Sequence, residues 1–121
     1  MCQAEHFHNL ADLAQGIARE LSPGVTTRIL PGEQAILSIA TIVRNGAGTL
    51  HSDLEGQCGV PLDGSAVRIR GGAETHVTKG DFWRTPGGVP HTMRAGPDGC
   101  QALDIFLPPR EAYRTTGSGF A

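Results

Sequence analysis

The sequence predicts an all-β domain, and two observations carry that prediction. Short runs rich in Val, Ile, Leu and Thr recur along the chain, and glycine or proline repeatedly separates them. The 17 Gly and 8 Pro leave little room for long helices. Many short strands joined by such turns are typical of a β-sandwich or a barrel. Because 121 residues are the usual size of one domain, we expect a single domain over 1–121.

About nine candidate strands can be placed in order, and some of them can merge. Region 65–70 sets Val67 and Ile69 against Arg68 and Arg70, which is the period of a strand with one face in water. Gly71-Gly72 then predicts a tight hairpin turn. The remaining candidate strands are 26–30, 34–43, 49–51, 58–62, 73–78, 81–85, 91–95 and 101–107.

The two ends of the chain are expected to differ from this pattern. A short helix or turn, packed on the outside, is expected within 9–20, and Ser22-Pro23-Gly24 would stop it. The polar segment after Pro108 ends in a Gly-rich stretch, so we expect partial disorder over about 117–121. The apolar residues at helical spacing near the start are Leu10, Leu13, Ala14, Ile17 and Leu21.

Composition excludes several classes of function. The net charge is −2 and no Lys/Arg block occurs, so we expect no nucleic-acid partner. The longest apolar stretch, 35–43, is far shorter than the ~20 residues that cross a bilayer, so no membrane span is expected. The first residues lack the pattern of a secretory signal. An odd number of cysteines without metal-site spacing suits free thiols in a reducing cytoplasm, at Cys2, Cys58 and Cys100.

Four residues are candidate metal ligands. His51 and Asp53 are two apart, so both side chains point to one face if the segment is extended, and Gln57 and His91 follow. Two histidines and a carboxylate with open positions are the usual non-haem Fe(II) set, while manganese, nickel and zinc are also compatible. Glu55 has the right parity to be an alternative carboxylate ligand. The alternative without metal is that Asp53 only hydrogen-bonds His51.

Asp104 is a candidate catalytic residue because it interrupts the apolar run 102–107. An unpaired carboxylate facing an apolar interior would cost several kcal/mol or shift its pKa. An acid kept in such a place is a functional candidate. Two alternatives are that Asp104 faces solvent while its neighbours face the core, or that it pairs with Arg110 for structure.

Two segments resemble the sequence motifs of the cupin family. His51-Ser-Asp53-Leu-Glu-Gly-Gln57, followed after six residues by Gly64, resembles the first motif, in which His-x-His precedes Glu or Gln and then Gly. Gly80-Asp-Phe-Trp-Arg-Thr-Pro86-Gly-Gly88-Val-Pro-His91 resembles the second motif, Gly-x5-Pro-x-Gly-x2-His, up to its final Asn, where this chain has Ala95. The resemblance covers about 26–107 and implies a single-domain cupin, a double-stranded β-helix or jelly-roll barrel.

By this resemblance, the family's metal ligands fall on His51, Asp53, Gln57 and His91. The chain departs from the family at Asp53, where most cupins have histidine, and at Gln57, where glutamate is commoner. An anionic ligand in place of a neutral one favours harder, more oxygen-loving metals. The resemblance implies one divalent ion, which is Fe, Mn, Ni or Zn.

The C-terminal segment resembles the ending of one cupin subgroup. Asp104-Ile-Phe106-Leu-Pro108-Pro-Arg110-Glu-Ala-Tyr113 is similar to the Asp-x-Phe-x-Pro-x-Arg-Glu-Asp-Phe/Tyr ending of small cupins of pectin and alginate degradation, which linearise unsaturated uronates. It implies that Asp104 is a general acid/base, Phe106 a wall of the site and Arg110 a clamp for a carboxylate. The same ending occurs in small cupins of unknown role, so it indicates the subfamily better than the substrate.

Three functions are compatible with these residues. The first is a metal-dependent enzyme on a small anionic or carbonyl substrate, such as ring opening or tautomerisation of an unsaturated uronate. The second is a non-haem Fe(II) dioxygenase, and the third is a barrel that binds a small ligand without catalysis. Arg28 is a further candidate for substrate binding, with a solvent-facing arginine as the alternative. We also expect a homodimer, formed through an edge strand or a swapped N-terminal segment.

Overall fold

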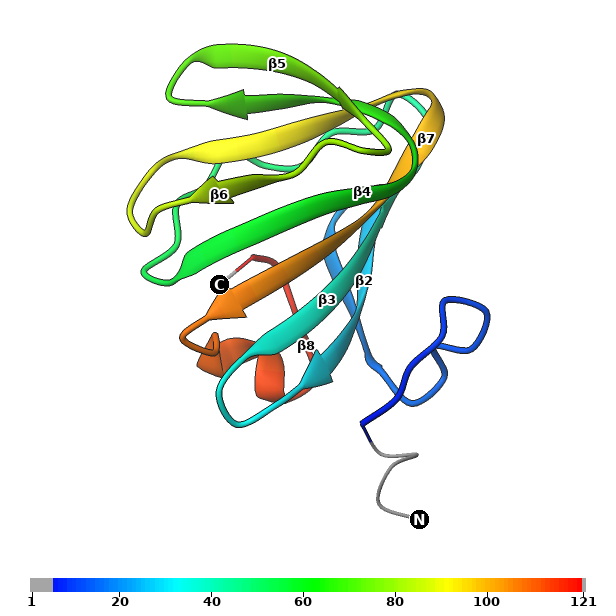
Figure 1. The fold of residues 1–121 in the computed structure, drawn as a ribbon, viewed down its shortest axis with the longest axis vertical. Helices are drawn as coiled ribbons and strands as arrows, with labels where there is room; N and C mark the ends of the chain where they lie inside the picture. The colour runs from blue at the N-terminus through cyan, green and yellow to red at the C-terminus, as the bar shows by residue number, and fades with distance from the viewer. Residues whose placement is uncertain (1–5, 121) are drawn as a thin grey trace.

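The computed structural model describes residues 6–120, and strands account for most of them (Figure 1). The all-β prediction is confirmed. One short 3-10 helix, η1 (Glu111–Arg114), follows the last long strand. The strands are β1 (Ile17–Ser22), β2 (Val25–Pro31), β3 (Ile36–Ile42), β4 (Gly56–Arg70), β5 (Ala73–Thr78), β6 (Trp83–Thr85), β7 (His91–Leu107) and β8 (Gly117–Ser118).

These strands form one curved sheet in the order β5-β4-β7-β3-β2-β1-β8, with β6 paired to β4. The two longest strands, β4 and β7, run antiparallel at its centre. Each merges two of the expected short strands: 58–62 with 65–70, and 91–95 with 101–107. Register shifts in β4 at 61–63 and 64–66 let these strands bend, since a bulge adds local curvature. The predicted hairpin turn at Gly71-Gly72 is confirmed, because Arg70 pairs with Ala73.

The concave side of the sheet holds the core. Along β3 and β7, opposite residues share a face, so Ile36 pairs with Phe106 and Ser38 with Asp104 on the inner side. The intervening pairs, Leu37 with Ile105 and Ile39 with Leu103, lie on the outer side. The buried apolar cluster on the inner side comprises Leu21, Val25, Ile29, Ile36, Ile42, Ala66, Val77, Ala95, Cys100, Phe106 and Tyr113.

Of the short helix or turn expected near the N-terminus, the structure forms turns and no helix over the described residues. Residues 6–16 form turns and irregular chain, and the second half of the predicted segment becomes β1. Ile17 to Glu20 pair with β2, and this pairing satisfies backbone groups that would otherwise stay exposed at the sheet edge. Sheet pairing therefore overrides the helical spacing of the apolar residues.

The C-terminal segment also differs from the expectation of disorder over 117–121. Strand β8 pairs in parallel with β1, and the buried Arg19 guanidinium donates to the carbonyls of Ala112, Ser118 and Gly119. Its guanidinium also lies over the Tyr113 ring, 4.8 Å from the ring centroid. These contacts hold the tail against the sheet up to Phe120, and Ala121 lies outside the described residues.

Two further expectations concern the cysteine thiols and a membrane span. Cys58 and Cys100 carry free thiols, as expected, while Cys2 lies outside the described residues. Over residues 6–120, no helix has the length and apolar character needed to cross a membrane.

Candidate functional site

Two histidines that are far apart in the sequence meet at the start of β7. His51, in the segment between β3 and β4, and His91 donate their backbone N–H groups to each other's carbonyls at 3.1 and 2.8 Å. This bridge places the two imidazole rings 4.5 Å apart, centroid to centroid. Backbone pairing, rather than side-chain packing alone, therefore sets the distance between the two candidate ligands.

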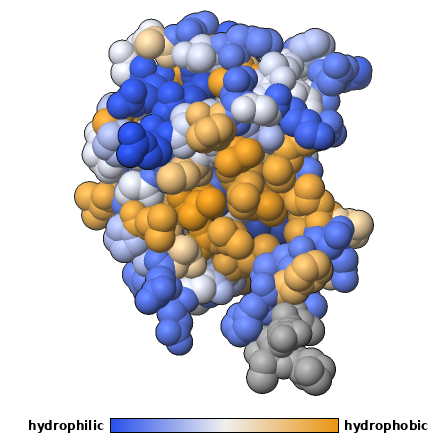
Figure 2. Space-filling view, viewed as in Figure 1, coloured by the Kyte–Doolittle hydropathy of each residue, from blue (hydrophilic) through white to orange (hydrophobic). Residues whose placement is uncertain are grey.

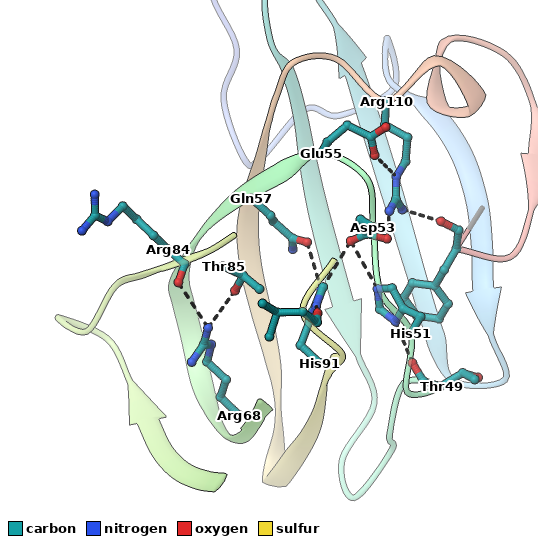
Figure 3. Close-up of polar contacts among 12 residues, drawn as sticks. Thr49, His51, Asp53, Glu55, Gln57, Arg68, Arg84, Thr85, His91 and Arg110 are labelled. Atoms are coloured by element: carbon teal, nitrogen blue, oxygen red, sulfur yellow. Dashed lines mark hydrogen bonds and ion pairs between the residues drawn. The ribbon is translucent and has the colours of Figure 1, made fainter. Parts of the chain in front are cut away.

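The turn before His91 positions Asp53. The Gly88 N–H donates to the Asp53 carbonyl at 2.6 Å, and Gly88 has a φ of +82°, which a residue with a Cβ rarely adopts. At Gly87 a Cβ would lie 2.3 Å from the Leu54 carbonyl oxygen. The two glycines let the turn pack directly on the 53–54 backbone. The buried Asp53 carboxylate then faces the histidines, with Oδ2 3.7 Å from His51 Nε2 and 3.4 Å from His91 Nε2 (Figure 3).

Four atoms with lone pairs converge at this point. His51 Nδ1 lies 2.7 Å from the Thr49 carbonyl and His91 Nδ1 lies 2.8 Å from the Val89 carbonyl. A carbonyl only accepts, so each Nδ1 carries the hydrogen and each neutral ring presents a lone pair at Nε2. Gln57 Oε1 lies 3.1 Å from His91 Nε2, and Asp53 Oδ2 is buried with no hydrogen-bond partner among residues 6–120.

This arrangement fits a divalent cation. The ligand atoms of His51, Asp53 and His91 all lie within 4.8 Å of one another. Burial lowers the pKa of His51 to about 4, partly opposed by the hydrogen bond to Thr49, so the ring is neutral at neutral pH, as a metal ligand must be. A single proton on one ring could not satisfy all the converging acceptors, whereas one cation could. The predicted set His51, Asp53, Gln57 and His91 is thus brought together.

Arg110 holds the other side of Asp53. Its guanidinium makes an ion pair with Asp53 Oδ1, and its Nε lies 3.2 Å from Glu55 Oε1. It also donates to the Phe120 carbonyl and lies 4.9 Å from the centroid of the Phe106 ring. Glu55, the alternative ligand, therefore faces Arg110 rather than the histidines. The role of Arg110 as a clamp for substrate stays a prediction, since protein carboxylates engage the guanidinium here.

Asp104 points inward, so the alternative in which it faces solvent is wrong. The residue is half-buried and lines a cavity on the concave side of the sheet. Burial raises the pKa of Asp104 to about 6, although a hydrogen bond with the Gln57 side chain and the nearby His91 oppose the shift. The Gln57 amide thus links Asp104 to the metal-ligand cluster. An acid with this pKa exists in both protonation states near neutral pH.

The site opens into a cavity of about 70 Å³ on the concave side of the sheet. Phe106 lies in its wall, as the resemblance implied, and packs edge-on against Tyr113 with the ring centroids 5.4 Å apart. Trp83 also lines the cavity, while its neighbour Phe82 is exposed. The expectation for Arg28 is wrong: Arg28 is exposed on the outer face of β2, because the alternation along that strand turns Thr27 and Ile29 inward.

Sequence reasoning missed two residues of this cavity. Arg68 faces inward from β4, whereas the alternation in 65–70 predicts only that it lies on the face opposite Val67 and Ile69. Phe120 stacks on the His51 ring, with the ring centroids 4.1 Å apart and the planes at 27°. Alternation could have flagged Arg68 but not its direction, and no local signal in the sequence indicates the contact of Phe120.

Solved structures with this architecture are cupins. An RmlC-like cupin from Shewanella frigidimarina has a TM-score of 0.76 at 21% identity, over 89% of this chain and 95% of that chain. KdgF from Halomonas sp. has a TM-score of 0.73 at 20% identity, over 82% of this chain and 92% of that chain. Oxalate decarboxylase from Bacillus subtilis has a TM-score of 0.69 at 23% identity, over 79% of this chain and 28% of that chain.

These likenesses show that the chain has the cupin fold, and they confirm the resemblance in the two sequence motifs at the level of fold. No family model and no curated protein matches the sequence.

Replacing Asp104 with asparagine should give a pH-dependent change in stability. Because the pKa of Asp104 rises from 3.8 to about 6 on folding, the native state binds this proton more tightly than the unfolded chain. Proton binding by Asp104 therefore stabilises the wild type, and this stabilisation is lost as the pH rises through this range. Asp104→Asn has no such proton, so its stability lacks this pH dependence. The free energy of unfolding of Asp104→Asn minus that of the wild type should therefore increase between pH 3.8 and about 6.

Urea unfolding in the presence of a chelator measures this difference, and the contribution of His51 is common to both proteins. Asp98→Asn is the matched control, because Asp98 is an exposed aspartate on the same strand. A difference that stays constant with pH would contradict the raised pKa of Asp104.

Proposed function

We propose that this protein is a metal-dependent cupin enzyme that acts on a small substrate with an anionic or carbonyl group. The observation that carries the proposal is the convergence of His51, Asp53, Gln57 and His91 beside an inward-facing Asp104 in one cavity. A structural role alone does not account for a buried carboxylate oxygen that has no hydrogen-bond donor.

The four residues would hold one divalent ion through two imidazole nitrogens and two oxygens. When bound, the ion would act as a Lewis acid that polarises a substrate oxygen. The mixed donor set is compatible with Fe, Mn, Ni or Zn, and the carboxylate favours the harder ions among them. Bacillus subtilis oxalate decarboxylase, which shares the fold, has Mn(II) centres.

Asp104 would transfer a proton to or from the substrate. Its carboxyl group, linked to the Gln57 amide, lies beside the metal ligands and can both donate and accept a proton near neutral pH. Phe106 would form an apolar wall that orients the substrate and excludes water from Asp104. Arg110 would act by fixing Asp53; the alternative role, a clamp for a substrate carboxylate, would compete with its ion pairs to Asp53 and Glu55.

The substrate that best suits these parts is an unsaturated uronate. Ring opening or tautomerisation of such a sugar acid requires a polarised oxygen, a proton donor and acceptor, and recognition of a carboxylate, with no redox change. The C-terminal segment from Asp104 to Tyr113, which resembles that of the uronate-linearising cupins, supports this choice.

The metal is tested first. Wild type offered iron, manganese, nickel or zinc and then desalted should retain about one ion per chain by elemental analysis. His91→Ala should lose the ion, because it removes the imidazole nitrogen that lies beside Gln57 Oε1 and would bind the ion. His76→Ala is the matched control, since this exposed histidine on β5 is outside the cluster and should leave the metal content unchanged. No ion above the His91→Ala background would contradict the metal centre.

Turnover is tested with the loaded protein. Unsaturated galacturonate should lose its absorbance at the conjugated double bond in the presence of wild type, and Asp104→Asn should reduce kcat by about 100-fold or more, the usual contribution of general acid/base catalysis. Retained metal in Asp104→Asn separates a loss of proton transfer from a loss of the site. Substrate binding without turnover by either protein would favour the non-enzymatic, ligand-binding function.

A second candidate is a non-haem Fe(II) dioxygenase, because the cluster contains two histidines and one carboxylate. Gln57 would occupy a further position on the ion and leave fewer positions for dioxygen and substrate. Oxygen uptake by the iron-loaded protein, measured with the same substrate, distinguishes this candidate from the first.

A homodimer is also proposed, and the outer face of the sheet supports it. Figure 2 shows apolar residues gathered over β3, β7 and β4, on the side opposite the core. These outward residues come from paired positions on the three strands and would be covered by a second copy. They are Leu37, Val60, Leu103 and Ile105, all half-buried, whereas Ile39 on the same side is already buried within the chain.

Sedimentation velocity should therefore give twice the mass of one chain. Ile105→Glu should shift the protein to the monomer, since it places a charge within the apolar face. Phe82→Glu is the control, because Phe82 is exposed outside that face and should leave the dimer intact. A wild-type monomer at all concentrations would contradict the proposal.

A further inference from the structure

The cavity beside the candidate metal site is bordered by two arginines whose partners differ. Arg110 is buried, and Asp53 and Glu55 already balance its charge. Arg68 reaches the same cavity from β4, and no carboxylate of residues 6–120 lies within ion-pair distance of it. In the view of Figure 3, the two guanidinium groups lie on opposite sides of His91. Arg68 therefore brings an unbalanced positive charge to the cavity.

The Arg68 guanidinium is held in place by neutral groups. Its Nη2 donates to Thr85 Oγ1 at 2.7 Å and, more weakly, to the Arg84 carbonyl at 3.5 Å. The group lies over the Trp83 ring, 5.2 Å from the centroid. Trp83 is itself packed against Gly59, where an added Cβ would lie 2.5 Å from the indole. The tryptophan and the threonine thus orient the guanidinium without neutralising it.

Two of its nitrogens remain available. Within the described residues, Arg68 Nε and Nη1 make no hydrogen bond, so each can donate a charge-assisted hydrogen bond to an anion. Burial, and then the positive charge of Arg70, lower the pKa of Arg68, so an anion beside it would relieve both penalties. The neighbouring inward residues, Ala66 and Met93, are apolar and offer no such anion.

We propose that Arg68 binds the carboxylate of the substrate, with Thr85 and Trp83 as the residues that orient it. This inference rests on the proposed function and deepens it: the substrate is a carboxylic acid whose acid group lies at Arg68 while its reacting end faces His51 and His91. The cavity of about 70 Å³ has room for only a few water-sized groups, at roughly 10–15 Å³ each. It therefore suits the acid end of a small molecule and not the interior of a polymer.

Binding, measured separately from turnover, tests the assignment. Isothermal titration of the metal-loaded wild type should detect galacturonate and not galactose, which lacks the carboxylate. Arg68→Met should weaken galacturonate binding by about tenfold or more, the usual range for a charge-assisted hydrogen bond. Arg68→Lys should recover part of the affinity, because it restores the charge but not the planar fork.

Arg70→Met is the matched control, since it removes an exposed arginine two residues further along the same strand. Its affinity for galacturonate should stay within about twofold of wild type. Equal affinity of Arg68→Met and wild type, or an equal loss in both variants, would overturn the inference. So would tighter Arg68-dependent binding of inorganic phosphate than of galacturonate. If Arg68→Met fails to fold, Thr85→Val supplies the second variant, since it removes only the hydroxyl that holds Nη2 and should also weaken binding.

Elemental analysis of the same samples keeps the two proposals distinguishable. A wild type that retains metal but does not bind galacturonate would overturn the role of Arg68 and leave the metal centre standing. A wild type without metal that still binds galacturonate through Arg68 would overturn the metal-dependent enzyme and support the carboxylate site.

Discussion

The buried ion pair between Arg110 and Asp53 is the interaction on which the site depends. It engages Asp53 Oδ1, so Oδ2 is the oxygen turned toward His51 and His91. The same guanidinium contacts Glu55, the Phe120 carbonyl and the Phe106 ring, and so ties the segment before β4 to the C-terminal tail. Removing one member of a buried pair typically costs about 3–5 kcal/mol, because the other charge is left uncompensated.

This pair also changes the charge of the candidate metal-ligand set. The resemblance to cupins places an aspartate where most members have a histidine, and an anionic ligand would by itself make the site more negative. Arg110 balances that charge from the far side of the carboxylate, which leaves the site closer to the charge of a neutral set. Glu55, on the same guanidinium, restores part of the negative charge without facing the histidines. Asp53 and Arg110 therefore act together in setting the charge of this cluster.

The two arginines of the cavity, Arg110 and Arg68, thus have different proposed roles. Arg110 forms ion pairs with protein carboxylates and positions Asp53, a candidate metal ligand. Arg68 is oriented by a hydroxyl, a carbonyl and an indole, and none of these neutral groups balances its charge. Between them lie the histidines and the Asp104–Gln57 pair, which together form the proposed reacting centre. An acid whose carboxylate meets Arg68 would point its other end toward that centre.

The sequence by itself determined the all-β class, the hairpin at Gly71-Gly72 and the grouping of the four candidate ligands, because turns, alternation and motif spacing are local properties of the chain. It left a short helix or a turn open within 9–20, where the chain forms turns and then pairs with β2 at the sheet edge. Alternation shows that neighbouring residues occupy opposite faces, but it does not say which face is concave. Only the curvature of the sheet decided that Asp104 and Arg68 point inward and Arg28 outward, and only the path of the tail brought Phe120 onto His51.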